Sequence, residues 1–302
     1  MMKLNQLVGA FNKWAPFALQ ESYDNSGLLV GDSNQEIERI LISLDITEEI
    51  IEEAIQGNFD LIISHHPIIF KGLKSLTGKT PEERVVMKAI KHDIAILAIH
   101  TNLDNVMHGV NAKIAEKLGI KNCKILLPQK GQLKKLAVYI PELHVEEVRQ
   151  AIFKVGAGHI GNYEHCSFGT QGIGTFKGNK DSNPFVGKPG HLHEEAEVKF
   201  ETVFPAHLQG KVISTLLKSH PYEEVAYDIY QLENKNDKVG AGIIGELSEE
   251  MEEVAFLSLL KEKMDVGCVR HTSLRQKKIK KVALCGGSGS FLIGAAKASH
   301  AD

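Results

Sequence analysis

Three apolar stretches, each of which runs into polar side chains, decide the fold: RILISLD at residues 39–45, DLIISHHP at residues 60–67 and IAILAIHTNLD at residues 94–104. Each has the short β-branched and aliphatic run of a buried strand. Between them lie two amphipathic stretches, at residues 47–56 and 81–91, whose Thr47 and Pro81 are typical of helix starts. Strands that alternate with helices predict an α/β fold with a mainly parallel sheet flanked by helices.

The middle of the chain has a different pattern. A strand at residues 136–140, a helix at 145–154 and a strand at 163–168 come first, followed by a Gly-, Pro- and Asn-rich loop at 169–189 and then by strand, helix and strand again. This repeated order predicts a ferredoxin-like α+β module.

Apolar strands resume after the polar stretch NKND, at residues 239–245 and 280–284, and we expect them to rejoin the first sheet. We therefore predict an α/β domain in two parts, residues 1–128 and 238–302, interrupted by an α+β insertion at residues 129–237.

Length and composition narrow the class of function. A chain of 302 residues is long enough for two domains without disulfides, and its four cysteines have no paired spacing, which favours a reducing, cytoplasmic compartment. The net charge of -3 is spread along the chain and predicts no basic surface for nucleic acid. No run is apolar enough for a membrane span, and the amino terminus does not resemble a signal peptide. A small polar substrate fits this composition best.

The candidate site lies where two predicted strands end. His65 and His66 follow the strand DLIIS, and Pro67 stops that strand, so that both imidazoles can face one site. The next strand runs into His100 and Asp104. Ligands bind at the carboxyl ends of parallel strands, and mixed imidazole and carboxylate ligation suits two divalent metal ions, with zinc favoured and iron or manganese as alternatives.

Simpler interpretations exist for each of these features. An isolated His-His pair is more often structural than a metal ligand. Residues 24–27 (DNSG) have the composition of a tight turn, and Asp45 could either orient an imidazole or cap a helix. The glycine-rich stretch at residues 286–289 could bind an anion or form a strand-to-helix turn. His191 and His193 lie beside a loop and are expected at the surface.

Four motifs in this order resemble the Nif-three-like family, whose members are known as GTP cyclohydrolase 1 type 2 homologues: DNSGLLVG, SHHPIIFKG, HTNLD and VALCGGSG. The resemblance runs through nearly the whole chain. It implies a dinuclear metal centre in a toroidal homohexamer and an inserted domain similar to PII and CutA proteins, with residues 220–230 (HPYEEVAYDIY) as part of that domain.

By this resemblance His65, His66 and Asp104 are metal ligands. The family takes two further ligands, a His and a Glu, from a carboxyl-terminal segment that has no counterpart here before Asp302. We therefore expect the second part of the α/β domain to lack the family's last strand, and we expect lower metal occupancy in a chain of this extent.

The functional hypothesis is a metal-dependent hydrolase acting on a nucleotide or a related small molecule, with His100 as the catalytic proton shuttle. A phosphoesterase that holds an anion at the turn beginning at Gly286 is one alternative. The other is a metal-dependent regulatory or interaction protein without turnover, in which the inserted module senses a ligand.

Overall fold

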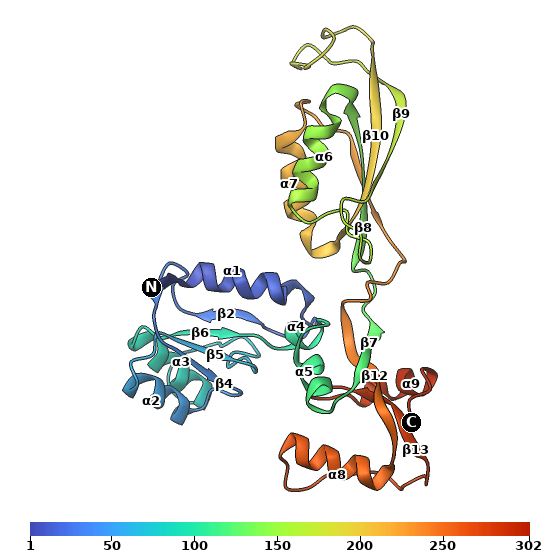
Figure 1. The fold of residues 1–302 in the computed structure, drawn as a ribbon. Coiled ribbons are helices and arrows are strands. Elements are labelled where there is room, and N and C mark those ends of the chain that lie inside the picture. Colours follow the sequence, from blue (N-terminus) through green and yellow to red (C-terminus); the bar gives the residue numbers. More distant parts are fainter. The chain divides into compact units, whose positions relative to one another are not determined.

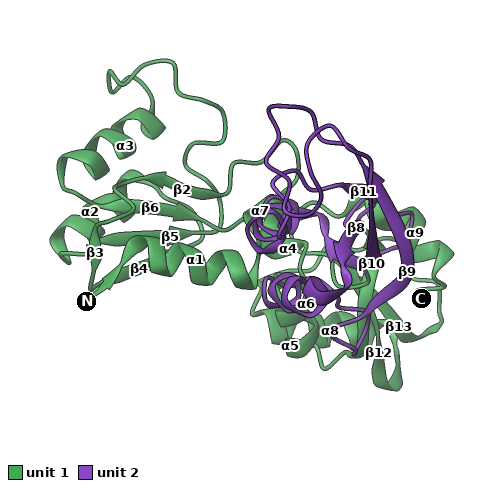
Figure 2. Ribbon diagram, turned by 90° about the horizontal axis from the view of Figure 1, so that it is seen from above, with its two compact units in different colours: residues 1–128, 237–302 green, residues 129–236 purple.

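The computed structural model describes residues 1–302, which form two compact units. Unit 1 consists of residues 1–128 and 237–302, and unit 2 consists of residues 129–236 (Figure 2). Each unit has hydrophobic clusters of its own. None of the helices combines the length and the apolar character that a membrane crossing requires.

The first sheet of unit 1 has four strands in the order β2-β6-β5-β4 (Figure 1). The strands β4, β5 and β6 are parallel, whereas β2 is antiparallel to β6. Helix α1 packs on one face, and α2 and α3 pack on the other. The bounds are α1 (Leu4–Trp14), β2 (Gly27–Val30), β4 (Ile40–Ser43), α2 (Glu48–Gln56), β5 (Leu61–Ser64), α3 (Pro81–Lys91) and β6 (Ala95–Ala98), and a short ribbon pairs β1 (Met2–Lys3) with β3 (Glu36–Ile37).

Local chemistry explains where the helices on this sheet begin. The Thr47 hydroxyl accepts the Ile50 amide at the start of α2, as the sequence predicted. Thr80 caps α3 in the same way by accepting the Glu83 amide, and Pro81 occupies the first turn. All four residues of β5 and all four of β6 are buried, because both faces of these central strands are covered.

A second sheet in unit 1 contradicts part of the prediction. The strands β12 (Gly240–Glu252) and β13 (Lys278–Leu284) do not rejoin the first sheet but pair antiparallel with each other, and β12 also pairs with β7 (Lys121–Pro128). The prediction of a mainly parallel sheet is therefore wrong for the molecule as a whole, and the fold is mixed α/β. Strand β7 is the last element of unit 1 before unit 2, and β12 is the first element of unit 1 after it. The remaining elements of unit 1 are η1 (Phe17–Leu19), α4 (Thr101–Asp104), α5 (Val110–Lys117), α8 (Glu253–Met264), η4 (Ser290–Leu292) and α9 (Ile293–Ala298).

Unit 2 is an antiparallel sheet in the order β11-β8-β10-β9, with α6 and α7 packed on one face (Figure 2). The expected loop at residues 169–189 is wrong in its first part, because Ser167–Phe176 is strand β9, which pairs with β10 along its length. Its glycines suggested a loop, but an edge strand tolerates them. The bounds are β8 (Leu133–Pro141), η2 (Glu142–His144), α6 (Val145–Lys154), β10 (His193–Pro205), η3 (Ala206–Leu208), α7 (Gln209–Ser219) and β11 (Tyr227–Gln231).

Candidate metal centre

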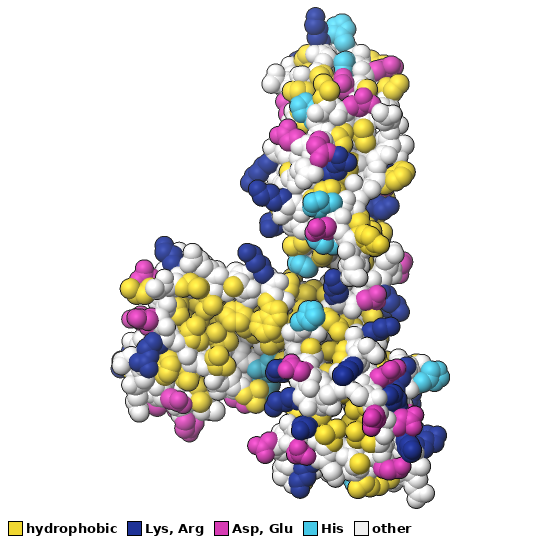
Figure 3. Space-filling model, in the orientation of Figure 1, with side chains coloured by type: hydrophobic (Ala, Val, Ile, Leu, Met, Phe, Trp, Pro, Cys, Tyr) yellow, Lys and Arg dark blue, Asp and Glu magenta, His cyan; other side chains and the backbone are white.

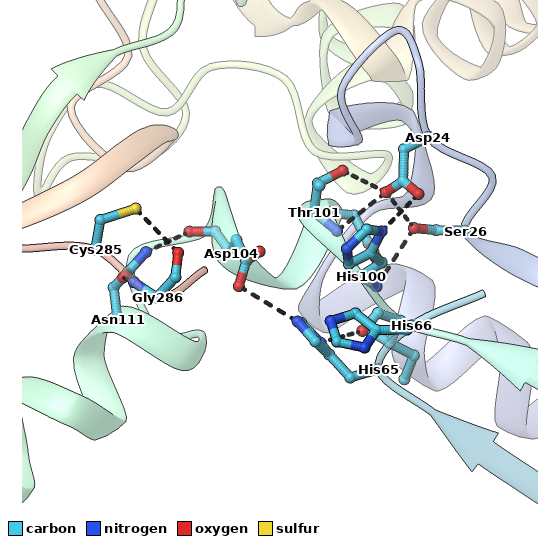
Figure 4. Close-up of polar contacts among 12 residues, drawn as sticks. Asp24, Ser26, His65, His66, His100, Thr101, Asp104, Asn111, Cys285 and Gly286 are labelled. Carbon is cyan, nitrogen blue, oxygen red and sulfur yellow. Dashed lines mark hydrogen bonds and ion pairs between the residues drawn. The ribbon is translucent and has the colours of Figure 1, made fainter. Parts of the chain in front are cut away.

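Three histidines converge at one edge of the first sheet (Figure 4). His65 and His66 directly follow β5, and His100 lies two residues after β6. Because Ser64 pairs with Ala98 in the parallel register, the two strands end side by side. The Ser64 hydroxyl donates to the His66 carbonyl at 2.8 Å, which holds the backbone in a turn after the strand ends.

The three imidazoles are close enough to share a metal site. The ring centroids of His65 and His66 are 5.0 Å apart, those of His65 and His100 are 5.1 Å apart, and those of His66 and His100 are 5.3 Å apart. One ring nitrogen from each lies within 4.8 Å of the others. This grouping could hold a metal ion, since ligand atoms around one or two ions fall in the same range.

Each imidazole has its Nδ1 atom held by an oxygen acceptor. His65 Nδ1 donates to the Ile99 carbonyl at 2.9 Å, His66 Nδ1 donates to Asp45 Oδ1 at 2.7 Å, and His100 Nδ1 donates to Asp24 Oδ1 at 2.7 Å. These acceptors fix the tautomer in which Nε2 carries a lone pair. Of the two roles considered for Asp45, the structure shows the contact to an imidazole.

Asp24 is a site residue that sequence analysis took for part of a turn. Its side chain is fully buried and also accepts the Thr101 amide at 3.0 Å and the Ser26 hydroxyl at 3.0 Å. Burial would raise the pKa of Asp24, but hydrogen bonds from Thr101, His100 and Asn25 outweigh burial and lower it. The strand pairing explains why Asp24 reaches the site. Because β2 runs antiparallel to β6, the residues before β2 lie beside the end of β6.

Asp104 supplies the carboxylate expected at this edge. It ends α4, and its Oδ1 lies 3.9 Å from His65 Nε2. That oxygen is buried and has no hydrogen-bond partner. Burial raises the pKa of Asp104 and lowers the pKa of His65, because burial disfavours the charged form of each side chain.

These side chains fit a divalent cation. An unsatisfied buried carboxylate oxygen is costly, and a cation held by both Asp104 and His65 would satisfy it. Two ligand atoms of one metal ion lie at most about 4.3 Å apart, so a separation of 3.9 Å is compatible with a shared ion. Neutral imidazoles with one carboxylate and no thiolate suit zinc, iron or manganese.

The turn that begins at Gly286 braces this site instead of offering an anion site. The Gly286 amide donates to Asn111 Oδ1 at 2.7 Å, and Asn111 Nδ2 donates to the Asp104 carbonyl at 3.0 Å. Asn111 is almost completely buried. The first amide of the glycine-rich turn is therefore already used, which favours the simpler interpretation of a strand-to-helix turn.

Histidines elsewhere do not join the site. His191 is exposed, as expected, and His193 is half-buried, with its Nε2 2.9 Å from Glu195 Oε2. The only group of three or more potential metal ligands that converge is the trio of His65, His66 and His100. The trio includes His100, for which sequence analysis predicted a proton-shuttle role.

Two known bacterial proteins are similar to this chain over nearly its whole length. A Bacillus subtilis protein named GTP cyclohydrolase 1 type 2 homolog is 44% identical over 298 residues, which are 98% of this chain and 80% of that protein. A Halalkalibacterium halodurans protein of the same name is 42% identical over 297 residues, which are also 98% of this chain and 80% of the relative.

Solved structures show the same fold. The crystal structure of a Bacillus cereus protein related to NIF3 is 42% identical, with a TM-score of 0.84, and the match covers all of this chain and 81% of that one. A Staphylococcus aureus protein, SA1388, is 32% identical with a TM-score of 0.75 over all of this chain and 80% of that one. The sequence profile of the Duf34/NIF3 (NGG1p interacting factor 3) family matches residues 2–302, and the chain belongs to that family.

Proposed function

We propose that this protein is a dinuclear-metal-dependent hydrolase that acts on a nucleotide or a related small molecule. The observation that carries this proposal is the way the three imidazoles are held. Each ring donates from Nδ1 to an oxygen, so that its Nε2 atom is available as a metal ligand. A purely structural role does not require three neighbouring imidazoles that each have a ligand nitrogen within 4.8 Å of the others. The names of the relatives support a nucleotide as the first substrate class to test.

The proposed ligands are His65, His66 and Asp104, with His100 as a further imidazole donor. Two divalent ions, with zinc as the first choice, would supply Lewis acidity and a nucleophile derived from water near neutral pH. The chain's own contribution is orientation. Asp24, Asp45 and the Ile99 carbonyl hold the rings, and Asn111 holds the backbone of Asp104.

Metal content and turnover test this proposal together. Elemental analysis of the purified protein is expected to show up to two metal ions per chain, and His65→Ala and Asp104→Ala are each expected to lose metal. His92→Ala is the matched control, because His92 is exposed at the end of α3. Equal metal content in all four proteins would show that the site is not a metal centre.

A panel of nucleotides and phosphoesters then separates catalysis from regulation. Turnover that requires both His65 and Asp104 supports a hydrolase. Metal binding without turnover of any compound would instead favour a metal-dependent regulatory protein. A cytoplasmic location and a homohexameric assembly are part of the same proposal.

A further inference from the structure

Unit 2 has a cavity on the sheet face opposite its two helices. Phe200 and Phe204 of β10 point to the helix side and pack in the core, so the alternate residues of β10 face the other way. The cavity has a volume of about 910 Å³, within the range of small-molecule sites. Its lining includes Tyr139, Gly174, Phe176, Phe185, Glu197 and Tyr222.

Glu197 is a buried carboxylate in this cavity without a cationic partner. It is 8% exposed, and its only hydrogen bond is to Oε1, from the Tyr222 hydroxyl at 3.0 Å. The next acidic side chains along the same face are both paired: Glu201 lies 3.6 Å from Lys135 Nζ and 3.5 Å from Lys199 Nζ, and Glu195 pairs with His193. Burying a charge costs free energy unless the charge is paired. A cationic ligand from outside this chain would supply the partner that Glu197 lacks.

The backbone of β9 makes room for this carboxylate. A Cβ atom on Gly174 would lie only 2.1 Å from Glu197 Oε2, and Gly172 is open on the same strand face. The glycines that suggested a loop therefore create the hollow into which Glu197 projects. Oε2 lies over this hollow and accepts no hydrogen bond from the protein.

The stretch HPYEE positions the other wall of the cavity. His220 Nε2 donates to the Tyr139 carbonyl at 2.9 Å, and its Nδ1 accepts the Tyr222 amide at 3.1 Å. Burial, followed by the hydrogen bond and the charge of Glu197, raises the pKa of Tyr222, so the hydroxyl stays protonated and remains a donor. The Tyr222 ring lies 5.9 Å from Phe176 and 6.3 Å from Phe185, between ring centroids.

We propose that this cavity binds a small organic cation, an amine or guanidinium attached to an aromatic or apolar body. The cationic nitrogen donates to Glu197 Oε2, and the body packs against Phe176, Phe185 and Tyr222. A metal ion is a poor occupant, because Glu197 belongs to no group of three or more converging His, Cys, Asp or Glu side chains. All of the residues that line this cavity belong to unit 2.

A pair of matched probes tests the charge requirement on the full chain. Tyramine carries an ammonium, and tyrosol has a neutral hydroxyl in its place on the same phenol. By calorimetric titration we expect tyramine to bind with a Kd below about 1 mM, and tyrosol to bind at least about tenfold more weakly. This comparison needs no variant and does not depend on any substitution being tolerated.

Two variants locate the binding to Glu197. Glu197→Gln keeps the shape of the side chain and removes its negative charge. We expect it to weaken tyramine binding about tenfold or more and to leave the affinity for tyrosol unchanged. Glu194→Gln is the control, because Glu194 is an exposed acid on the opposite face of the same strand. Equal affinity for the two probes, an equal effect of the two variants, or no tyramine binding at about 10 mM would each overturn the proposal.

Discussion

Asp24 fixes the orientation of the His100 ring through a hydrogen bond to its Nδ1 atom. Its carboxylate has no exposed surface and receives the His100 ring, the Thr101 amide and hydroxyl, and the Ser26 hydroxyl. The side-chain oxygen of an asparagine at this position can accept the hydrogen bond from the His100 ring. Its NH2 group, however, would face other hydrogen-bond donors, which is unfavourable. We expect Asp24→Asn to cost about 1–3 kcal/mol of stability and to weaken metal binding roughly 10- to 100-fold.

Urea unfolding and metal titration measure these two effects of Asp24→Asn. The comparison variant is Asp45→Asn, which changes the acceptor of His66 at an exposed position, where such a contact contributes at most about 1 kcal/mol. A stability loss for Asp24→Asn no larger than for Asp45→Asn would mean that burial of the Asp24 carboxylate does not matter.

His100 has two possible roles, which His100→Ala separates. If its Nε2 is a ligand, as the distances to His65 and His66 favour, the variant loses metal together with His65→Ala. A proton shuttle would leave the metal content intact and lower turnover alone, by about 100-fold or more. We expect loss of metal, measured by elemental analysis after dialysis. Full metal content in His100→Ala would return this residue to the shuttle role.

At the scale of elements, Glu83 organises the segment that leads into α3. Its buried carboxylate accepts the amides of Thr77 and Lys79 and the hydroxyls of Thr77 and Ser75. The Thr77 amide and the other donors lower the pKa of Glu83 to about 2, although burial opposes them. Because the pKa is lower in the folded state, this contribution to stability is complete above about pH 4.5 and is lost as the pH falls toward about 2.

Glu83→Gln tests that sign. The variant is expected to unfold at a lower urea concentration than the wild type at pH 7, and the gap between the two proteins should narrow at pH 3. Glu53→Gln is the control, since Glu53 lies exposed on α2. A gap that stays constant between pH 7 and pH 3 would show that the titration of Glu83 does not contribute.

The elements that the sequence predicted best are those with local signals. Thr47 and Pro81 mark helix starts by side-chain chemistry that acts within one turn, and the helix predicted over residues 81–91 matches α3 residue for residue. Strand β9 was missed because glycines at an edge carry the same composition as a loop. The pairing of β12 with β7 was missed because the pairing partner of a strand is decided by tertiary contacts.

In the candidate site too, the residues with local sequence signals were predicted and those placed by long-range contacts were not. His65 and His66 were predicted at a strand end because Pro67 is a local stop signal. Asp24 and His100 are 76 residues apart, and Asn111 and Gly286 are 175 residues apart. No local pattern reports such contacts, so the orienting residues required the fold.

For the whole molecule, the two units have separate hydrophobic cores. The two points at which the chain leaves unit 1 and returns to it lie side by side. Gly240 pairs with Pro128, so the chain leaves unit 1 at β7 and resumes beside it at β12. We expect that replacing residues 129–236 with a short Gly/Ser linker leaves a folded unit 1 that binds metal like the full chain. Circular dichroism and metal titration check this. An unfolded product would mean that unit 1 depends on unit 2 for stability.

A homohexamer buries apolar surface between its subunits, and the edge strand β4 of unit 1 offers such a surface. Ile42 is 77% exposed and Leu44 is 60% exposed. Ile42 pairs with Ile63, whose side chain lies in the cluster under α1, so Ile42 extends this sheet face beyond the helix. Figure 3 shows hydrophobic side chains gathered on the α1 side of unit 1. Such exposed apolar surface is typical of subunit interfaces.

Light scattering after gel filtration tests both the assembly and this surface. Six chains of 33.3 kDa give an expected mass of about 200 kDa. Burying an isoleucine contributes about 1.5–3 kcal/mol per interface, so Ile42→Lys is expected to shift the mass toward smaller species at low protein concentration. Leu143→Lys, at a 96% exposed position in unit 2, should leave the mass unchanged. A wild-type mass of about 33 kDa would exclude the hexamer, and an unchanged mass for Ile42→Lys would place the interface on another face.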